Sequence, residues 1–289
     1  MSFNKKSVRF TDYELNTPED LTKLESKKVA LVTGASKGVG KGAAEGLAEA
    51  GYKVYFTGRS SSKDNPPKPL TIEATAQSVD KFGGEGIPIL LDHNDDKQVQ
   101  KLVDRIQMED GRLDVLVNNV YQIPNPPAMG KGFWEHPISV WDDQCGVGLR
   151  GYYVMSALAA PLMVEQSSGL IVNISSRGGR EYVFSASYGA GKAGVDRMAQ
   201  DMALELEPHN VAALSLSPSK VKTEFILDMV AQGKMKIDPD EAQSVRFTGR
   251  VIAAIASSAD VMTLSGGIYT VSGLAARLGV EDPEPGANF

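Results

Sequence analysis

A tyrosine and a lysine four positions apart, Tyr188 and Lys192, could form an acid–base pair. On a helix, residues at this spacing share a face, so the ammonium would lie one turn from the phenol. An unperturbed tyrosine titrates near pH ~10, and a nearby ammonium favours its ionised form. The pair would then act as a general acid and base near neutral pH. The same spacing also occurs by chance where an ordinary helix begins with a surface lysine. The surrounding residues must therefore decide between a catalytic pair and an ordinary helix.

Two serines, Ser175 and Ser176, end an apolar run shortly before this pair. One hydroxyl could bind a substrate oxygen and stabilise the charge that develops on it. Serines in such a position also cap turns. We expect Ser176 to take the substrate role, and the short connection to Tyr188 leaves Ser175 open as the alternative. The predicted catalytic residues are therefore Ser176, Tyr188 and Lys192.

A glycine-rich turn far upstream indicates a dinucleotide site. The segment Thr33–Gly40 reads TGASKGVG and ends an apolar run. Gly34 would permit the sharp bend, Gly38 would let the backbone approach a pyrophosphate, and Gly40 would let helix and strand pack closely. The helix that follows adds free N–H groups and the positive end of its dipole. Glycines in such a turn can serve packing alone, but the strand before and the helix after favour a cofactor site.

The residues after the second apolar run predict which cofactor is bound. A site selective for NADH has an acid there for the ribose hydroxyls, and this chain has none before Asp64. Arg59 and Lys37 would instead bind the 2′-phosphate of NADPH. The alternative is that both side chains are simply solvated. The sequence therefore predicts a preference for NADPH. Asp92 would hold the adenine or cap the next helix. Two further turn residues, Ser36 and Val39, complete the expected contacts.

Short apolar runs alternate with helical patterns from Lys28 onward. Most runs are apolar throughout, which is typical of strands covered on both faces. Their alternation with helices predicts βαβ units and a parallel sheet. We expect a single α/β domain over residues 28–278, with about seven strands in a doubly wound sheet, between an irregular extension (1–27) and a tail (279–289) that is loose or docks on a partner subunit. The runs are Val29–Thr33, Lys53–Thr57, Ile87–Leu91, Val115–Asn118, Leu170–Ile174, Ala212–Ser217 and Ile268–Val271.

Three irregular segments leave the carboxyl ends of predicted strands, where ligands bind in open α/β sheets. Ser60–Leu70 follows the second strand, near the expected ribose. Gln122–His136 and Glu224–Thr248 follow the fourth and sixth strands, and the substrate would enter between them. Phe133 and Trp134, in the first of these two segments, and Tyr121 just before it favour an apolar or aromatic substrate, the alternative being rings that fill the core.

Composition excludes several classes of function. The chain of 289 residues has 30 Lys and Arg against 36 Asp and Glu, which argues against a general nucleic-acid binder. Its single cysteine, Cys145, precludes an intrachain disulfide, and its three histidines lack metal-ligand spacing. The longest apolar stretch, Val154–Val164, is too short to span a bilayer, and residues 1–27 contain no apolar leader. We therefore expect a soluble, cytoplasmic protein without a bound metal.

In their order along the chain, these motifs resemble those of the short-chain dehydrogenase/reductase family. The resemblance runs from about Lys28 to Leu278, and Phe133–Gly151 is similar to one branch of the family. It covers the turn at Thr33–Gly40, Asn118-Asn119, the Ser-Tyr-Lys residues and the segment Pro218–Thr223.

The resemblance implies a Rossmann-type fold and hydride transfer between NADP(H) and a carbonyl or alcohol substrate. Tyr188 would donate the proton, and Lys192 would also bind the ribose. Asn118 would tie neighbouring strands, and Val221 and Thr223 would contact the cofactor, the latter at the nicotinamide amide. The family also implies paired long helices in a homodimer or homotetramer.

Three places in the chain depart from the family pattern, one of them Pro218-Ser219, where the family has Pro-Gly. Tyr121 stands where the motif Asn-Asn-Ala-Gly has glycine, and Gly148 stands where many members have an asparagine that holds a water behind the lysine. Gln144, one turn before Gly148, is our hypothetical replacement. Two alternatives remain open: a non-redox cyclase or isomerase that keeps NADP bound, and a cofactor-binding sensor without turnover.

Overall fold

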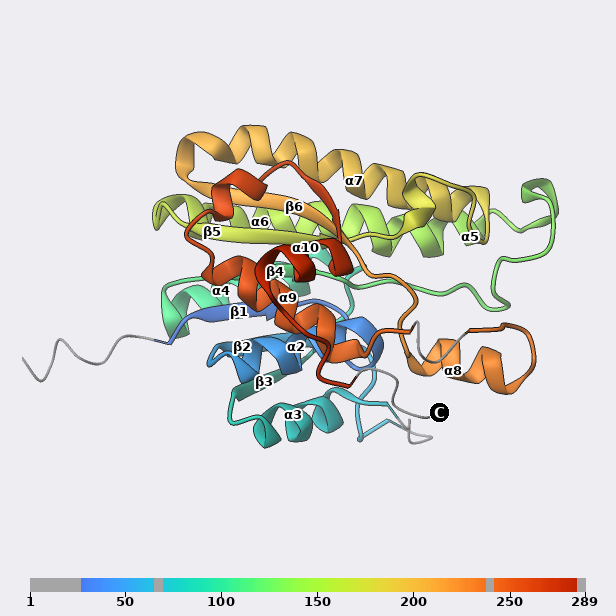
Figure 1. Ribbon diagram of the computed structural model, residues 1–289, viewed down its shortest axis with the longest axis horizontal. Coiled ribbons are helices and arrows are strands. Elements are labelled where there is room, and N and C mark those ends of the chain that lie inside the picture. The colour runs from blue at the N-terminus through green and yellow to red at the C-terminus, as the bar shows by residue number, and fades with distance from the viewer. Residues whose placement is uncertain (1–26, 65–69, 238–241, 285–289) are drawn as a thin grey trace, which may run out of the picture.

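Seven parallel strands form one sheet at the centre of the fold (Figure 1). The computed structural model describes residues 27–64, 70–237 and 242–284, and its strand order is β3-β2-β1-β4-β5-β6-β7. The order reverses between β1 and β4, so their carboxyl ends border the crevice where ligands bind in such sheets. The predicted Rossmann-type, doubly wound α/β fold is confirmed. The strands are β1 (Val29–Val32), β2 (Lys53–Gly58), β3 (Glu85–Leu90), β4 (Val115–Asn118), β5 (Gly169–Ile174), β6 (Val211–Ser217) and β7 (Ile268–Thr270).

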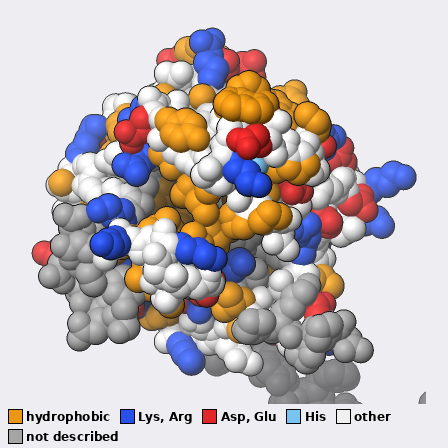
Figure 2. All heavy atoms as spheres, turned by 90° about the vertical axis from the view of Figure 1, so that its right-hand side faces the viewer, with side chains coloured by type: hydrophobic (Ala, Val, Ile, Leu, Met, Phe, Trp, Pro, Cys, Tyr) orange, Lys and Arg blue, Asp and Glu red, His pale blue; other side chains and the backbone are white. Residues whose placement is uncertain are grey.

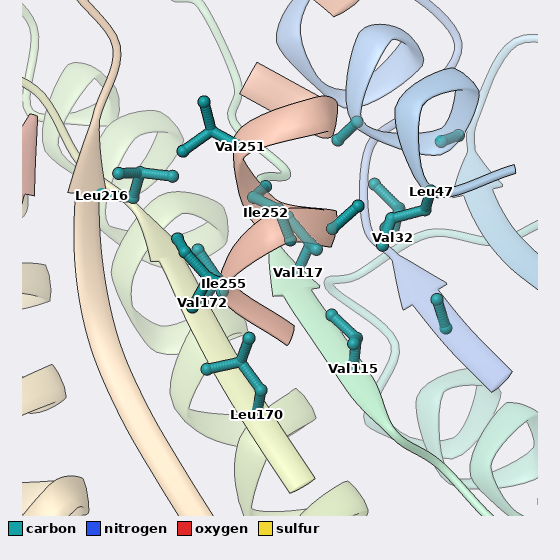
Figure 3. Close-up of a cluster of buried hydrophobic side chains, with 14 of the residues drawn as sticks. Val32, Leu47, Val115, Val117, Leu170, Val172, Leu216, Val251, Ile252 and Ile255 are labelled. Carbon is teal, nitrogen blue, oxygen red and sulfur yellow. The ribbon is translucent and has the colours of Figure 1, made fainter. Parts of the chain in front are cut away.

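Helices cover both faces of the sheet because successive strand residues point to opposite sides. Val32 belongs to the core under one helical layer and Leu31 to the core under the other. Figure 3 shows the first core, where Ile252 and Ile255 reach the strands. Full burial of one such side chain contributes about 1.5–3 kcal/mol. The first layer holds α2 (Gly38–Glu49), α3 (Ile72–Lys81), α9 (Val245–Ser257) and α10 (Val271–Leu278), and the second holds α4 (Asp96–Asp110), α6 (Gly151–Glu165) and α7 (Ala186–Leu206).

One long helix runs without a break from Ser139 to Glu165. It consists of α5 (Ser139–Trp141), a π-helical stretch η2 (Asp142–Arg150) and α6. The Gly151 N–H donates to the carbonyl of Gly146, five residues earlier, as a π-helix requires. By length and apolar composition alone this helix could cross a membrane. The sequence analysis considered only Val154–Val164 and therefore underestimated the length of the apolar helix. Half of its most apolar window is buried inside the fold, as in a core helix.

Two expectations about irregular segments need correction. Glu224–Thr248 contains α8 (Glu224–Ala231) and the start of α9, because Thr223 and Ser244 cap these two helices. The described part of the tail docks on its own chain, where the Asp282 carboxylate accepts from the N–H and hydroxyl of Ser244 at 2.8 and 2.6 Å. Residues 1–26 of the predicted extension and 65–69 of the Ser60–Leu70 segment lie outside the described residues. Short 3₁₀ turns are η1 (Phe133–Glu135), η3 (Arg177–Gly179), η4 (Glu207–His209) and η6 (Val261–Leu264).

Candidate active site

The tyrosine expected to act as the acid lies at the start of α7. Ser185 caps this helix, and its hydroxyl accepts from the Tyr188 N–H at 3.2 Å. The Tyr188 hydroxyl donates to Ser176 Oγ at 2.9 Å. The Ser175 hydroxyl points elsewhere and donates to the Lys192 carbonyl at 3.4 Å. Of the two serines, the structure therefore brings Ser176 to the tyrosine.

Lys192 is buried one helical turn from Tyr188. Its side chain is 7% exposed, and its Nζ donates to the carbonyl of Ile174 at 2.9 Å. Burial lowers the pKa of Lys192 to about 8, and the Asp196 carboxylate opposes this change. The lysine therefore titrates close to physiological pH, well below an exposed lysine.

The electrostatics of Tyr188 differ from our expectation. Burial raises the pKa of its hydroxyl, whereas the hydrogen bond with Ser176 and the charge of Arg177 lower it by less. In the structure, desolvation outweighs the charges that would favour the ionised form, and the ionisation expected with an oxidised nicotinamide beside the tyrosine stays a prediction. Tyr188 stays protonated near neutral pH, which is the form that can donate a proton.

The glycine-rich turn is held by hydrogen bonds from neighbouring strands. The Gly34 N–H donates to Thr57 Oγ1 at 3.1 Å, and Asn119 Nδ2 donates to the carbonyls of Thr33 and Gly34 at 2.9 Å each. Gly34 has φ +69°, and a Cβ there would lie 2.6 Å from Val120 Cα. Only glycine fits such a position. A Cβ on Gly40 would in turn lie 2.3 Å from the carbonyl oxygen of Gly34.

A carboxylate binds the N-terminus of α2. Gly38 adopts φ +59°, and its N–H donates to Glu224 Oε2 at 2.8 Å. Helix N-termini of this kind bind phosphates, so the glutamate carboxylate supplies the negative charge that the turn is built to receive. The sequence analysis missed the contact of Glu224 with this turn, and it placed Asn119 in a motif without giving it a role. The glutamate follows the predicted contact Thr223 directly, and that adjacency was the available signal.

The predicted determinants of cofactor preference lie at the ends of two paired strands. Lys37 is exposed at the start of α2, and the Arg59 guanidinium lies 3.8 Å from the Asp92 carboxylate. The alternative that Asp92 caps a helix is wrong. It accepts from the Asn94 N–H at 3.0 Å, while Asp95 caps α4. The other two turn residues, Ser36 and Val39, are half-buried.

The remaining predicted cofactor residues have different surroundings. Asn118 is fully buried and its Nδ2 donates to Asn173 Oδ1 at 2.9 Å, which ties β4 to β5. Its side chain therefore supports the spacing of the strands. Val221 forms a β-bridge with Gln243, and the Thr223 hydroxyl accepts from the Ile226 N–H at 3.3 Å. A Cβ on Gly38 would lie 3.4 Å from the methyl group of Thr223.

Two of the departures from the family pattern, Tyr121 and Gly148, are in contact with each other. The ring of Tyr121 packs over Gly148, where a Cβ would lie 2.7 Å from Tyr121 Cδ2. Gln144 precedes Gly148 on η2, and its side-chain carbonyl oxygen accepts from the hydroxyls of Ser185 and Ser187 at the start of α7. Gln144 thus supports the catalytic helix, and it is the Tyr121 ring, 5.3 Å from Lys192 Nζ, that lies beside the lysine.

Three exposed aromatic side chains line a cavity beside the start of α7. Phe133, Trp134 and Tyr182 are each more than two thirds exposed, at 71, 75 and 77%. They line a cavity of about 180 Å³ together with Ser185 at the start of α7. Figure 2 shows the side of the molecule that lies at the right of Figure 1, and hydrophobic side chains gather there around a hollow. A larger groove, of about 530 Å³, lies away from these residues between α2, α9 and the tail.

Comparison with known proteins agrees with this geometry. A family model described as short chain dehydrogenase matches residues 28–232. The mouse (Mus musculus) protein named dehydrogenase/reductase SDR family member 1 is 40% identical over 269 residues, which cover 88% of this chain and 83% of the relative.

Solved structures show the same fold. A short-chain type dehydrogenase/reductase from Mycobacterium marinum superposes with a TM-score of 0.72 at 26% identity, over 87% of this chain and 96% of that one. A metagenomic short-chain oxidoreductase in complex with NADP gives 0.66 at 26% identity, over 84 and 94%. The chain therefore belongs to the short-chain dehydrogenase/reductase family, on the branch of dehydrogenase/reductase SDR family member 1 that Phe133–Gly151 resembles.

Proposed function

We propose that this protein is an NADPH-dependent oxidoreductase that interconverts a carbonyl compound and its alcohol, with Tyr188 as the general acid and base. The observation that carries the proposal is the 2.9 Å hydrogen bond between the Tyr188 hydroxyl and Ser176 Oγ, one helical turn from the buried Lys192. These groups follow β5 at the carboxyl edge of the sheet, the same edge as the glycine-rich turn. An acid thus lies where a dinucleotide and a substrate would meet.

The residues present fit a nicotinamide dinucleotide. Gly34 permits the tight packing of the turn against Val120, and the Gly38 N–H at the start of α2 already donates to a carboxylate, as it would to a phosphate. Arg59 and Lys37 would hold the 2′-phosphate of NADPH, Asp92 the adenine, and Thr223 the nicotinamide amide. Ser36, Val39 and Val221 would line the remaining length. The solved relative in complex with NADP supports this assignment.

The protein's own groups would handle the proton. Ser176 would donate a hydrogen bond to the substrate oxygen, and Tyr188 would transfer its proton to that oxygen as charge develops. A bound NADPH would supply the hydride to the carbonyl carbon. Because burial raises the pKa of Tyr188, the protonated form dominates near neutral pH, which supports the reductive direction. The exposed aromatic rings around the cavity beside the start of α7 favour an apolar or aromatic carbonyl substrate. The family also supports a homodimer or homotetramer.

The first test is oxidation of NADPH in the presence of a panel of aldehydes, ketones and quinones, with NADH in parallel. We expect turnover with NADPH, weaker turnover with NADH, and a product heavier than its substrate by two hydrogens. Tyr188→Phe removes the proton donor and keeps the ring, so kcat should fall by on the order of 10²–10⁴-fold. Fluorescence titration with NADPH would show whether this variant still binds the cofactor.

The outcomes separate the alternatives. Turnover that persists in Tyr188→Phe would overturn the assignment of the acid. NADPH binding without oxidation of NADPH by any member of the panel would favour a sensor. A product of the same mass as its substrate would favour an isomerase.

A further inference from the structure

The buried ammonium of Lys192 lies between two aromatic rings. Its Nζ is 5.3 Å from the centroid of Tyr121 and 5.7 Å from that of Tyr152. A cation within about 6 Å of a ring centroid is attracted by the ring, and more strongly in a desolvated site. Tyr152 is fully buried, and its hydroxyl donates to the same Ile174 carbonyl that accepts from the lysine. The two rings therefore replace part of the electrostatic stabilisation that water would give to an exposed ammonium.

The Tyr121 ring reaches this position because residue 148 has no side chain. A Cβ on Gly148 would lie 2.7 Å from Cδ2 and 3.2 Å from Cε2 of Tyr121, closer than ordinary packing allows. Both atoms belong to a rigid ring, so the contact could be relieved only if the whole ring moved. Gly148 and Tyr121 therefore act as a pair, in which one residue leaves the space that the other fills.

The same ring contacts the proposed acid. Tyr121 meets Tyr188 edge to face, with centroids 5.8 Å apart and planes at 89°. Phe184, which has a φ of +63°, packs against Tyr188 at 5.2 Å. A positive φ at a bulky residue is costly and is found where function requires it. Two rings therefore restrict the orientation of the Tyr188 phenol.

The hydroxyl of Tyr121 contributes less than its ring. It is buried, and no described residue forms a well-aligned hydrogen bond with it. Burial raises the pKa of this hydroxyl, Tyr188 raises it further, and nearby Gln144 opposes the rise. The hydroxyl therefore stays protonated and uncharged, and the ring face is the part of Tyr121 that acts on Lys192.

We propose that Tyr121 is a positioning residue, whose ring holds Lys192 in its charged form and orients Tyr188, and that Gly148 admits this ring. The inference rests on the proposed function for its catalytic consequence. Its electrostatic part concerns the lysine alone. Besides the two rings, the ammonium has the Ile174 carbonyl at 2.9 Å, and the charge of Asp196, a turn farther along α7, acts on it. Asp196 also favours the charged lysine, so the contribution of the ring must be isolated by substitution.

The test is a pH titration of Lys192 by NMR, in protein labelled with ¹³C-lysine and with Lys192→Met to assign the signal. The wild type should titrate at about 8, where burial and Asp196 place the pKa. Tyr121→Met fills most of the ring volume without a π face. The ammonium then loses a favourable partner while it stays buried, so the pKa should fall by roughly 0.5–1 unit. Tyr121→Phe keeps the face and should titrate like the wild type.

Tyr153→Met is the matched control, because this tyrosine is 59% exposed on α6, next in sequence to Tyr152. It should leave the titration unchanged. A Tyr121→Met pKa that equals or exceeds the wild-type value would overturn the proposal. So would a Tyr121→Phe pKa that falls as far as that of Tyr121→Met, because the hydroxyl would then be responsible.

The catalytic part has its own measurement. In Tyr121→Met, kcat should fall about tenfold, and the alkaline limb of kcat/KM should move to lower pH together with the lysine. Tyr121→Phe should restore both values. If the wild type shows no turnover but the titration shifts as expected, the proposed function fails and the positioning role stands. If the wild type turns over and neither the titration nor the profile shifts, only the positioning role fails.

Discussion

At the scale of single residues, the contact between Gly148 and Tyr121 makes a prediction that uses two substitutions. Gly148→Ala places a Cβ 2.7 Å from a ring atom of Tyr121, so the ring must move away from Lys192 and Tyr188. Displacement of a positioning group by about 1 Å can cost on the order of 10²-fold in rate. We expect kcat to fall at least tenfold, measured as oxidation of NADPH with the best substrate of the panel.

The double variant shows whether this loss passes through the ring. Tyr121→Ala removes the atoms that the new methyl group would meet. Adding Gly148→Ala to that background should therefore cost little more, which is a strong coupling in a double-mutant cycle. Independent, additive losses would mean that residue 148 acts through another neighbour.

Only part of this buried site could be predicted from the sequence. The spacing of Tyr188 and Lys192 predicted their shared helical face, and the structure places Ser176 against the tyrosine. The rise in the Tyr188 pKa on burial was not predicted, because desolvation depends on how closely other segments cover the ring. The two departures at Tyr121 and Gly148 were visible as single positions, 27 residues apart in the chain. Their contact exists only once the segment after β4 lies against η2.

At the scale of elements, α8 is attached to the cofactor turn through its first residue. The Gly38 N–H donates to the Glu224 carboxylate at 2.8 Å, and this N–H belongs to the helix end that would receive a phosphate. A bound anion would have to displace the carboxylate. Glu224→Gln weakens the contact that must break, by about 1 kcal/mol, so NADPH should bind roughly fivefold more tightly. Fluorescence titration would measure this affinity.

The control for this change lies on the same helix. Asp228→Asn removes one negative charge from α8 at an exposed position whose partner is Gln232. A general electrostatic effect would strengthen NADPH binding in both variants. Tighter binding in Glu224→Gln alone would assign the effect to the contact with Gly38, and equal affinities in the two variants would contradict it.

The elements themselves were predictable because each carries a local signal. Fully apolar runs predicted the parallel strands, and the largest discrepancy is β3, which begins at Glu85 rather than Ile87. The segment Glu224–Thr248 was harder, because α8 is short and its capping residue, Thr223, was assigned to the cofactor instead. The docking of Asp282 on Ser244 depends on tertiary contact and has no local signal.

At the scale of the whole molecule, burial of Lys192 implies a cost in stability. Its folded pKa of about 8 lies below the ordinary value of 10.5, so the folded state binds this proton less well than the unfolded state. The cost is full below pH ~8, fades as the pH rises, and is gone above pH ~10.5, with a size on the order of 3 kcal/mol. Lys192→Met should therefore raise the free energy of unfolding at pH 7.

Urea denaturation of both proteins at pH 7 and near pH 10 would measure this effect. The advantage of Lys192→Met should shrink at the higher pH, because the wild type then folds with a neutral lysine. The lost hydrogen bond to Ile174 reduces the gain at both values. A variant that is less stable than the wild type at pH 7 would show that the ring contacts and Asp196 fully offset the desolvation.

The π-helical stretch Asp142–Arg150 limits how the length of this chain can change over evolution. A surface loop tolerates the loss of a residue, because nothing downstream depends on its length. Each π turn holds one residue more than an α turn, so a deletion here would let Ser139–Glu165 continue as an ordinary α-helix. The part before the deletion would then rotate by about 100° relative to the sheet. Trp141, now half in solvent, and Gln144, now buried against α7, would change their surroundings together. Homologues should therefore conserve the number of residues in this stretch even where they do not conserve its sequence.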